Sequence, residues 1–185
     1  MERGVRRLEI FQDDFDKMIF MEILRDELNK NECKLHAYCL MSNHFHFLLE
    51  TGETEIGKFM KGLACKYAMQ YNHRYSFKGH VFEDRYKSCL VESDEYFLQT
   101  SRYIHLNPVK AKMVSHPEDY RWSSYRGILG FCDDKVSEKD KTLRYFGKKG
   151  ILGYREFVED IGHKYVIEED RIKRSMGEDD LWLPW

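Results

Sequence analysis

The chain has 185 residues, a hydrophobic fraction of 42% and a formal net charge of −2. This length suits one domain with an appendage, and the apolar content is enough for a core, which argues against wholesale disorder. The five cysteines are odd in number and show no CxxC spacing, so a disulfide framework and a zinc knuckle are disfavoured. With no bilayer-length apolar run and no signal peptide, the sequence predicts a soluble, cytoplasmic protein without a membrane partner.

The first part of the chain predicts a helix followed by a β-hairpin. Residues 13–30 carry apolar side chains at helical spacing after two aspartates that can cap the helix. Residues 33–41 have the character of a buried strand, Ser42-Asn43 is a turn signal, and residues 44–50 predict the returning strand. A second amphipathic helix is expected to begin at Thr54.

The later elements complete an α+β arrangement. Residues 81–92 predict another strand, and a third helix starts at Ser93 or Asp94. Asn107-Pro108 is expected to interrupt that helix, with Asn107 both ending it and starting the next, because proline is tolerated in a first helical turn and asparagine is a good cap. The order of elements indicates helices packed on a mainly antiparallel sheet. We therefore expect a catalytic domain over residues 1–130 and a C-terminal helical appendage or tail, of unknown role, over 131–185.

Basic residues gather in the middle of the chain although the net charge argues against a nucleic-acid-binding protein. Between Lys58 and Cys89, seven lysines and arginines stand against two acidic residues. Such a stretch can bind phosphates, and its interleaved aromatic rings can stack on bases. It is also typical of a solvated helix face, so both interpretations stay open. The candidate DNA-binding residues are Lys58, Lys61, Lys66, Arg74, Arg85 and Lys87.

The tripeptide His44-Phe45-His46 lies on the predicted returning strand. Successive side chains of a strand point to opposite faces, so His44, His46 and Leu48 share one face. Phe45, Phe47 and Leu49 share the other face and can pack into a core, while the two imidazoles form a plausible pair of metal ligands. Two alternating histidines are also common as ordinary surface residues, so this pattern alone does not decide.

Tyr103 and Asn107 are four residues apart on the third predicted helix. At this spacing both side chains fall on one helix face, where a phenol and a carboxamide address the same place. The chain has 12 tyrosines, however, and a tyrosine on an amphipathic helix is more often a packing residue.

Four segments resemble the REP-associated tyrosine transposase family, relatives of the single-tyrosine HUH transposases. They are LHAYCLMSNHFHFLLE, GHVFEDRYKS, SRYIHLNPVKA and PEDYRWSSYRG, and they follow the family's order over residues 3–130. The resemblance implies an HUH, ferredoxin-like transposase fold. It also implies a DNA transposase, or single-strand DNA endonuclease and strand transferase, that works in DNA transposition and recombination. The expected reaction is metal-dependent cleavage and strand transfer of single-stranded or hairpin DNA through a 5′-phosphotyrosine intermediate.

The resemblance also implies roles for individual residues. His44 and His46 match the histidines that hold Mg²⁺ or Mn²⁺, and Asn107 falls where relatives place a polar third metal ligand. Tyr103 matches the nucleophile, so Tyr103, His44 and His46 are the expected catalytic residues.

One feature departs from the family pattern. Members begin with a strand that ends near an Arg-Gly pair, and here the sequence begins almost at that pair, as Arg3-Gly4. The first strand is therefore expected to be missing, which would leave an unpaired apolar sheet edge. A misassigned start, a decayed element or a homodimer that supplies the strand would each explain this. The alternative functions are a non-catalytic hairpin-DNA-binding protein, an inactive truncated relic, and an unrelated metal-dependent hydrolase that would need acidic ligands near the histidines.

Overall fold

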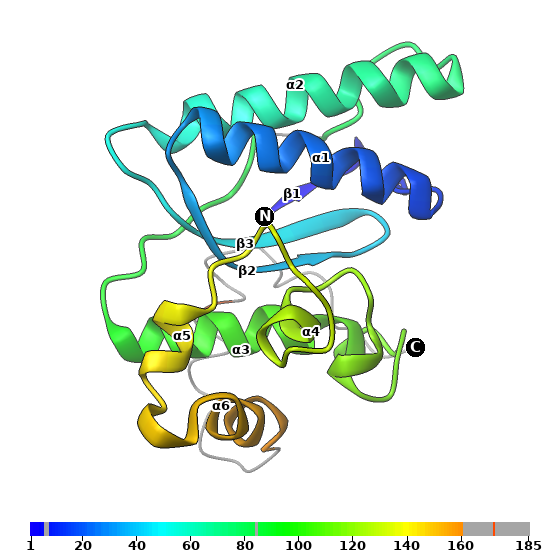
Figure 1. The fold of residues 1–185 in the computed structure, drawn as a ribbon. Coiled ribbons are helices and arrows are strands. Elements are labelled where there is room, and N and C mark those ends of the chain that lie inside the picture. Colours follow the sequence, from blue (N-terminus) through cyan, green and yellow to red (C-terminus); the bar gives the residue numbers. More distant parts are fainter. Residues whose placement is uncertain (6–7, 84, 161–171, 173–185) are drawn as a thin grey trace.

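The structure is a computed structural model that describes residues 1–5, 8–83, 85–160 and 172. Its centre is an antiparallel sheet of three strands in the order β1-β3-β2. Two long helices lie on one face of this sheet and a third lies on the other (Figure 1). The strands are β1 (Glu2–Arg3), β2 (Lys34–Leu40) and β3 (His44–Glu50), and the long helices are α1 (Asp14–Lys30), α2 (Ile56–Tyr75) and α3 (Asp94–Lys110). The predicted α+β fold with an antiparallel sheet is confirmed.

Alternating side chains of the β2–β3 hairpin supply both hydrophobic layers. Phe45 packs in the first layer with residues of α1 and α2, among them Phe20 and Leu63. Leu48 belongs to the second layer, with residues of α3 such as Ile104. The predicted division of β3 into a histidine face and a phenylalanine face is therefore observed.

The helices begin where their capping residues predict. Asp13 caps α1, since its side chain accepts a hydrogen bond from the backbone N–H of Asp16 at 3.0 Å. Ser93 caps α3 in the same way, accepting from the N–H of Tyr96 at 3.1 Å. Each cap satisfies one of the backbone donors that the first helical turn leaves unpaired.

The expected interruption at Asn107-Pro108 is wrong, because α3 continues through Pro108 to Lys110. Only two residues of the helix follow the proline, and the N–H of Ala111 still reaches the carbonyl of Asn107 at 2.9 Å. The missing proline N–H therefore costs one bond near the helix end, where packing of the buried ring outweighs it.

The strand predicted for residues 81–92 is also not formed in the part of that segment which the structure describes. The segment runs beside the N-terminus, where the N–H of Glu83 donates to the carbonyl of Arg3 at 3.0 Å and that of Lys87 to Met1 at 2.9 Å. Regular pairing is limited to one isolated bridge between Gly4 and Phe82. Because β1 has only two residues, it offers too short a partner for a second ladder.

The place of the strand expected to be missing is held by β1. Its residues pair with the start of β3, Glu2 opposite Phe45 and Arg3 opposite His44. Within the described residues, β3 has no strand partner on this side beyond Phe45. The expected open edge is thus present, and it begins after Phe45, so β1 pairs with His44 but not with His46.

Residues after α3 fold into short helices beside and below it (Figure 1). A third hydrophobic cluster joins Tyr125 and Ile128 of α4 (Tyr125–Ile128) to Tyr154 and Val158 of α6 (Gly150–Glu159). A further helix, α5 (Asp140–Arg144), and two 3₁₀ turns, η2 (Pro117–Asp119) and η3 (Gly147–Lys149), complete this part. The appendage predicted for residues 131–185 extends outside the described residues, and its boundary at residue 130 stays a prediction. None of the helices described here has the length and apolar character required to cross a membrane.

Candidate active site

The two histidines of β3 lie side by side on the α3 side of the sheet. Their ring centroids are 4.8 Å apart and the rings are nearly perpendicular, at 85°. Both side chains leave the same face of one strand two residues apart, so the backbone itself sets their spacing. The pair is thus held together before any ligand arrives.

Asn43, which the sequence marks only as a turn residue, orients the first of these rings. The Nδ1 atom of His44 lies 2.6 Å from the Oδ1 atom of Asn43. An amide oxygen can only accept, so Nδ1 carries the proton and the lone pair is on Nε2. An outer partner of this kind is how metal-binding histidines are commonly fixed in one tautomer.

Burial keeps both imidazoles neutral. Desolvation lowers the pKa of His44 to about 3, and the positive charge of Arg3 adds to the effect. Desolvation also holds the pKa of His46 well below its usual value, with His44 as the next cause. A neutral imidazole is the form that binds a metal ion, so at neutral pH neither ring has to lose a proton first.

Helix α3 packs on this face of the sheet and places Tyr103 against the two histidines. The ring centroids of His46 and Tyr103 are 5.9 Å apart, in an edge-to-face arrangement at 89°. The Nζ atom of Lys110 lies 4.8 Å from the centre of the Tyr103 ring. Tyr103 is only 2% exposed and shares its hydrophobic cluster with Ile172. The structure therefore gathers His44, His46 and Tyr103 from two elements into one site.

Asn107 lies one turn after Tyr103, as its spacing predicts. Its Nδ2 atom donates to the backbone carbonyl of Tyr103 at 2.9 Å, so the amide group is held close to α3. Among the residues that the structure describes, no group of three or more His, Cys, Asp and Glu side chains is placed to hold a metal ion. The amide oxygen of Asn107 lies outside that set of residue types, and its role as a third ligand stays a prediction.

A buried polar network anchors the helix that carries Tyr103. His105 of α3 makes two contacts of 2.7 Å, from Nδ1 to the hydroxyl of Tyr154 and from Nε2 to the hydroxyl of Ser124. The Tyr154 hydroxyl also meets Ser101 Oγ at 2.6 Å, and Ser124 Oγ accepts from the N–H of Tyr38 on β2 at 2.9 Å. The network links α6, α3 and the sheet, and so restricts rotation of α3 relative to the histidine strand.

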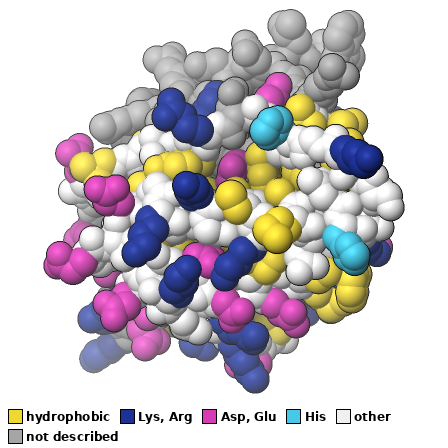
Figure 2. Space-filling view, turned by 90° about the horizontal axis from the view of Figure 1, so that it is seen from above, with side chains coloured by type: hydrophobic (Ala, Val, Ile, Leu, Met, Phe, Trp, Pro, Cys, Tyr) yellow, Lys and Arg dark blue, Asp and Glu magenta, His cyan; other side chains and the backbone are white. Residues whose placement is uncertain are grey.

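Two of the predicted DNA-binding cations are engaged in ion pairs between α1 and α2. Lys66 Nζ lies 2.7 Å from Oε1 of Glu27, a side chain that is 1% exposed. Arg74 reaches Asp13 with Nη1 at 2.8 Å and also pairs with Asp16. Seen over these helices, Lys and Arg side chains alternate with Asp and Glu and form no continuous basic patch (Figure 2).

The other four predicted cations divide between two places. Lys58 and Lys61 are exposed on α2, across the sheet from the histidine pair. Arg85 and Lys87 are exposed on the segment that runs beside β1, at the edge of the candidate site. The four make no ion pair with any residue in the described ranges. The local basic stretch of the sequence therefore wraps around the β1 edge of the sheet.

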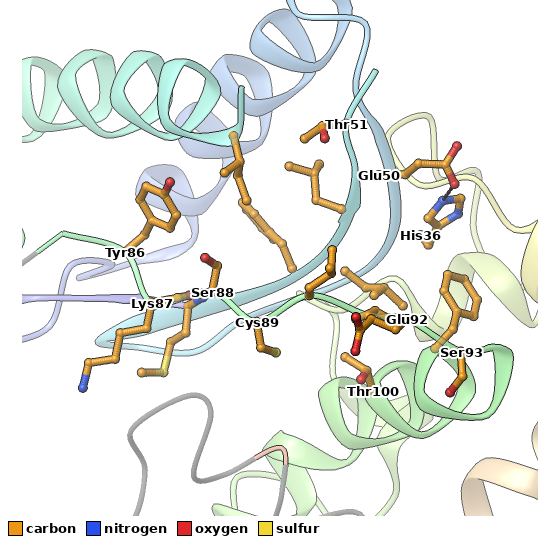
Figure 3. A pocket seen from close by; sticks show the side chains of 18 of the residues that line it. His36, Glu50, Thr51, Tyr86, Lys87, Ser88, Cys89, Glu92, Ser93 and Thr100 are labelled. Carbon is orange, nitrogen blue, oxygen red and sulfur yellow. Dashed lines mark hydrogen bonds and ion pairs between the residues drawn. The ribbon is translucent and has the colours of Figure 1, made fainter. Parts of the chain in front are cut away.

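A pocket of about 530 Å³ continues along the open edge of β3 (Figure 3). Its walls come from β3, from residues 86–93 and from the first turns of α3, with Leu48, Cys89 and Phe97 among the apolar lining. Lys87, Ser88 and Thr100 add polar groups (Figure 3). The pocket starts at Met1, where β1 ends its pairing with β3, and reaches Glu50 at the other end of the strand.

Comparisons with known proteins agree with this arrangement. A family model described as IS200-like transposase matches residues 3–107. A solved structure of a REP-associated tyrosine transposase bound to a REP hairpin is similar in fold, with a TM-score of 0.58 and 14% sequence identity. The similarity covers 74% of this chain and 87% of that one. No curated protein matches the chain.

The Lys66–Glu27 pair predicts a selective loss of stability. Burial raises the pKa of Glu27, but Lys66 and Asn31 outweigh it and hold that pKa below its usual value. Lys66→Met leaves the carboxylate without its cation, and we expect the urea concentration at the midpoint of unfolding to fall, by an amount that solvent screening of the exposed Lys66 limits. Urea unfolding at pH 7 measures this loss.

The same pair sets the pH dependence of that loss. A lowered folded pKa stabilises above the unfolded pKa, and this contribution disappears as the pH falls through the folded value. The difference between Lys66→Met and the parent should therefore shrink on acidification. Lys61→Met, on the same helix but without an ion pair in the described residues, serves as the control and should leave the unfolding free energy unchanged. An equal loss in both variants would contradict the assignment.

Proposed function

Since the chain belongs to the IS200-like transposase family, we propose that it cleaves and rejoins single-stranded or hairpin DNA through Tyr103. The observation that carries this proposal is the contact of the Tyr103 ring with His46, which itself adjoins His44. A phenol next to two neutral imidazoles combines a nucleophile with a metal-binding pair. Each of these groups comes from a rigid helix or strand, as precise chemistry requires.

The proposed reaction is an in-line displacement at phosphorus. The phenolic oxygen of Tyr103 loses its proton and forms a bond to phosphorus, while the bond from phosphorus to the 3′ oxygen breaks and that oxygen takes up a proton. The products are a 5′-phosphotyrosine link and a free 3′-hydroxyl. Attack by a second 3′-hydroxyl reverses the step and joins two strands, and no nucleotide cofactor is consumed because the covalent link keeps the bond energy.

The residues fit a divalent metal ion. His44 presents Nε2 because Asn43 engages Nδ1 at 2.6 Å, and burial keeps both rings in the ligand form. His44, His46 and the amide oxygen of Asn107 would hold Mg²⁺ or Mn²⁺, with water or a phosphate oxygen completing the set. The ion would supply Lewis-acid polarisation of the scissile phosphate and offset its developing charge.

The nature of the DNA follows from access to the site. Tyr103 lies in the layer between α3 and the sheet, so the attacked phosphate has to enter an enclosed place that a continuous duplex does not fit. The similar solved structure was obtained with a hairpin, which makes a hairpin with an unpaired flank the first ligand to test. A homodimer that adds a strand to the open edge of β3 stays a prediction.

A second candidate function is binding of hairpin DNA without cleavage by the same fold. It is favoured by the burial of Tyr103, whose side chain is 2% exposed. In that case the phenol serves packing, and the histidine pair is a remnant of the catalytic site. The two functions differ in whether a covalent protein–DNA product forms.

The nucleophile is tested by Tyr103→Phe. We expect the parent protein, incubated with labelled hairpin oligonucleotides and Mn²⁺, to give a protein-linked band on denaturing electrophoresis. Tyr103→Phe should abolish that band because it removes the attacking oxygen, while binding should change less than about 3-fold, since cationic contacts to the DNA backbone dominate the affinity. Tyr96→Phe, two turns earlier on α3, is the matched control and should keep the band. A band that persists in Tyr103→Phe would assign the nucleophile elsewhere.

The metal site is tested by His44→Ala and His46→Ala. Loss of a ligand should weaken Mn²⁺ binding at least about 10-fold, by analogy with the loss of outer-shell partners, and the titration can be followed by electron paramagnetic resonance without DNA. Cleavage should fall in parallel. His73→Ala, an exposed histidine on α2, should change neither quantity. Unchanged Mn²⁺ affinity in both site variants would remove these histidines from the metal site.

The cations at the β1 edge should affect both binding and catalysis. Replacing Arg85 and Lys87 by glutamine should reduce the salt dependence of single-strand binding by about 1.4 in log–log slope, or about 0.7 for each phosphate that is no longer neutralised. It should also lower the rate of adduct formation at saturating DNA, since these residues adjoin the site. The double glutamine variant of Lys58 and Lys61 removes the same charge across the sheet and should reduce only the binding affinity. Equal effects on the rate would show that position relative to the sheet is irrelevant.

A further inference from the structure

Strand β1 places a third basic group beside the histidine pair. Arg3 is the antiparallel partner of His44, and directly opposed residues in such a ladder project from the same face. The charge of Arg3 also acts on the two histidines. After burial, the positive charge of Arg3 is among the causes that lower the pKa of His44 and of His46. Arg3 therefore faces the site from the side opposite to β2.

The backbone holds Arg3 in this position independently of its side chain. The carbonyl of Arg3 accepts from the N–H of Glu83 at 3.0 Å, and the next N–H, of Gly4, donates to the carbonyl of Asn43 at 2.9 Å. A Cβ atom at Gly4 would collide with the backbone of Leu8, so the chain can turn away directly after Arg3 only with glycine there. Because backbone contacts fix the position of Arg3, its guanidinium is not needed to hold the strand and can bind a ligand.

The guanidinium has donors without acceptors among the described residues. Its Nε and Nη2 atoms are shielded from solvent and have no hydrogen-bond partner, and within the described ranges Arg3 forms no ion pair. Glu2 does not neutralise it, because consecutive strand residues point to opposite faces and Glu2 stands opposite Phe45. Glu2 and Glu83 both line the same small cavity of about 60 Å³, but within the described residues neither carboxylate forms an ion pair with the Arg3 guanidinium. Shielded donors left unsatisfied in a folded protein commonly mark a place where a ligand completes the bonds.

We infer that Arg3 binds a non-bridging oxygen of the phosphate that Tyr103 attacks, and so completes the candidate active site from the β1 edge. The planar fork of a guanidinium matches two phosphate oxygens, and its charge persists at all physiological pH values. Negative charge increases on these oxygens as Tyr103 adds, so the contact stabilises the transition state more than the bound DNA. The inference rests on the proposed function, and the experiment below separates the two.

The first part of the test is the rate. In the hairpin cleavage assay with Mn²⁺ and saturating DNA, Arg3→Gln should slow formation of the protein-linked product about 100- to 1000-fold, as loss of one charge-stabilising donor does elsewhere. Arg3→Lys keeps the charge but loses the planar guanidinium, so its rate of product formation should lie between the rates of Arg3→Gln and the parent. Arg121→Gln, an exposed arginine beside Trp122, is the control and should keep the parent rate.

The second part is a binding measurement that a purely structural role would not affect. Tyr103→Phe protein, in EDTA, is titrated with oligonucleotides that carry either the normal phosphate or a neutral methylphosphonate at the mapped cleavage position. We expect the neutral group to weaken binding about 10-fold, as loss of a charge-assisted hydrogen bond does. In the Arg3→Gln, Tyr103→Phe double variant the two oligonucleotides should bind equally.

Each outcome decides between the two ideas. If the methylphosphonate weakens binding equally with and without Arg3, the Arg3 contact is overturned, even if Arg3→Gln has slowed the cleavage reaction. Cleavage by the parent protein would in that case leave the proposed function intact. Failure of the parent to form any Tyr103-linked product would overturn the proposed function and the role of Arg3 together.

Discussion

The alternation of side chains along β3 is the constraint on which the rest of the structure depends. One face of this strand supplies Phe45 to the layer under α1 and α2, and the other supplies Leu48 to the layer with α3. The register that buries both apolar sets also turns His44 and His46 toward α3. A slip of one residue would turn the phenylalanines toward α3 and the imidazoles toward α1 and α2. Packing and chemistry are therefore specified by the same periodicity.

The position of α3 is determined by contacts that lie away from the chemistry. His105 and Tyr154 join α3 to α6, and Arg102 donates from Nε to the carbonyl of Phe157 at 3.0 Å. These polar groups are buried, so breaking any of them would leave an unsatisfied partner. Residues of α6 thus help hold Tyr103 against the sheet, which makes the part up to residue 160 a support for the candidate site.

The distribution of charge follows the layers rather than the sequence. Lys66 and Arg74 belong to the basic stretch, yet they hold α2 to α1 through acidic partners. Arg85 and Lys87 lie near Arg3, which is far earlier in the chain, and these three line one small cavity. A cation already paired with a buried carboxylate gains little from a phosphate, because the first interaction has to be given up. The cations at the β1 edge, which form no ion pair within the described residues, are the better candidates for DNA contacts.

The sequence by itself determined the elements whose physical cause is local. Alternation predicted the two faces of β3, and the motif blocks predicted the transposase family. Helical spacing, with Asp13 or Asp14 and Ser93 or Asp94 as cap candidates, predicted where α1 and α3 begin. The tertiary structure decided what depends on distant partners. Pro108 stays within α3 because packing outweighs one lost bond, and the described part of residues 81–92 forms no strand because β1 is too short to pair with it. Lys66 pairs with Glu27 because α1 and α2 pack in one layer, and Arg3 faces His44 because of the register between β1 and β3. No local sequence pattern encodes either contact.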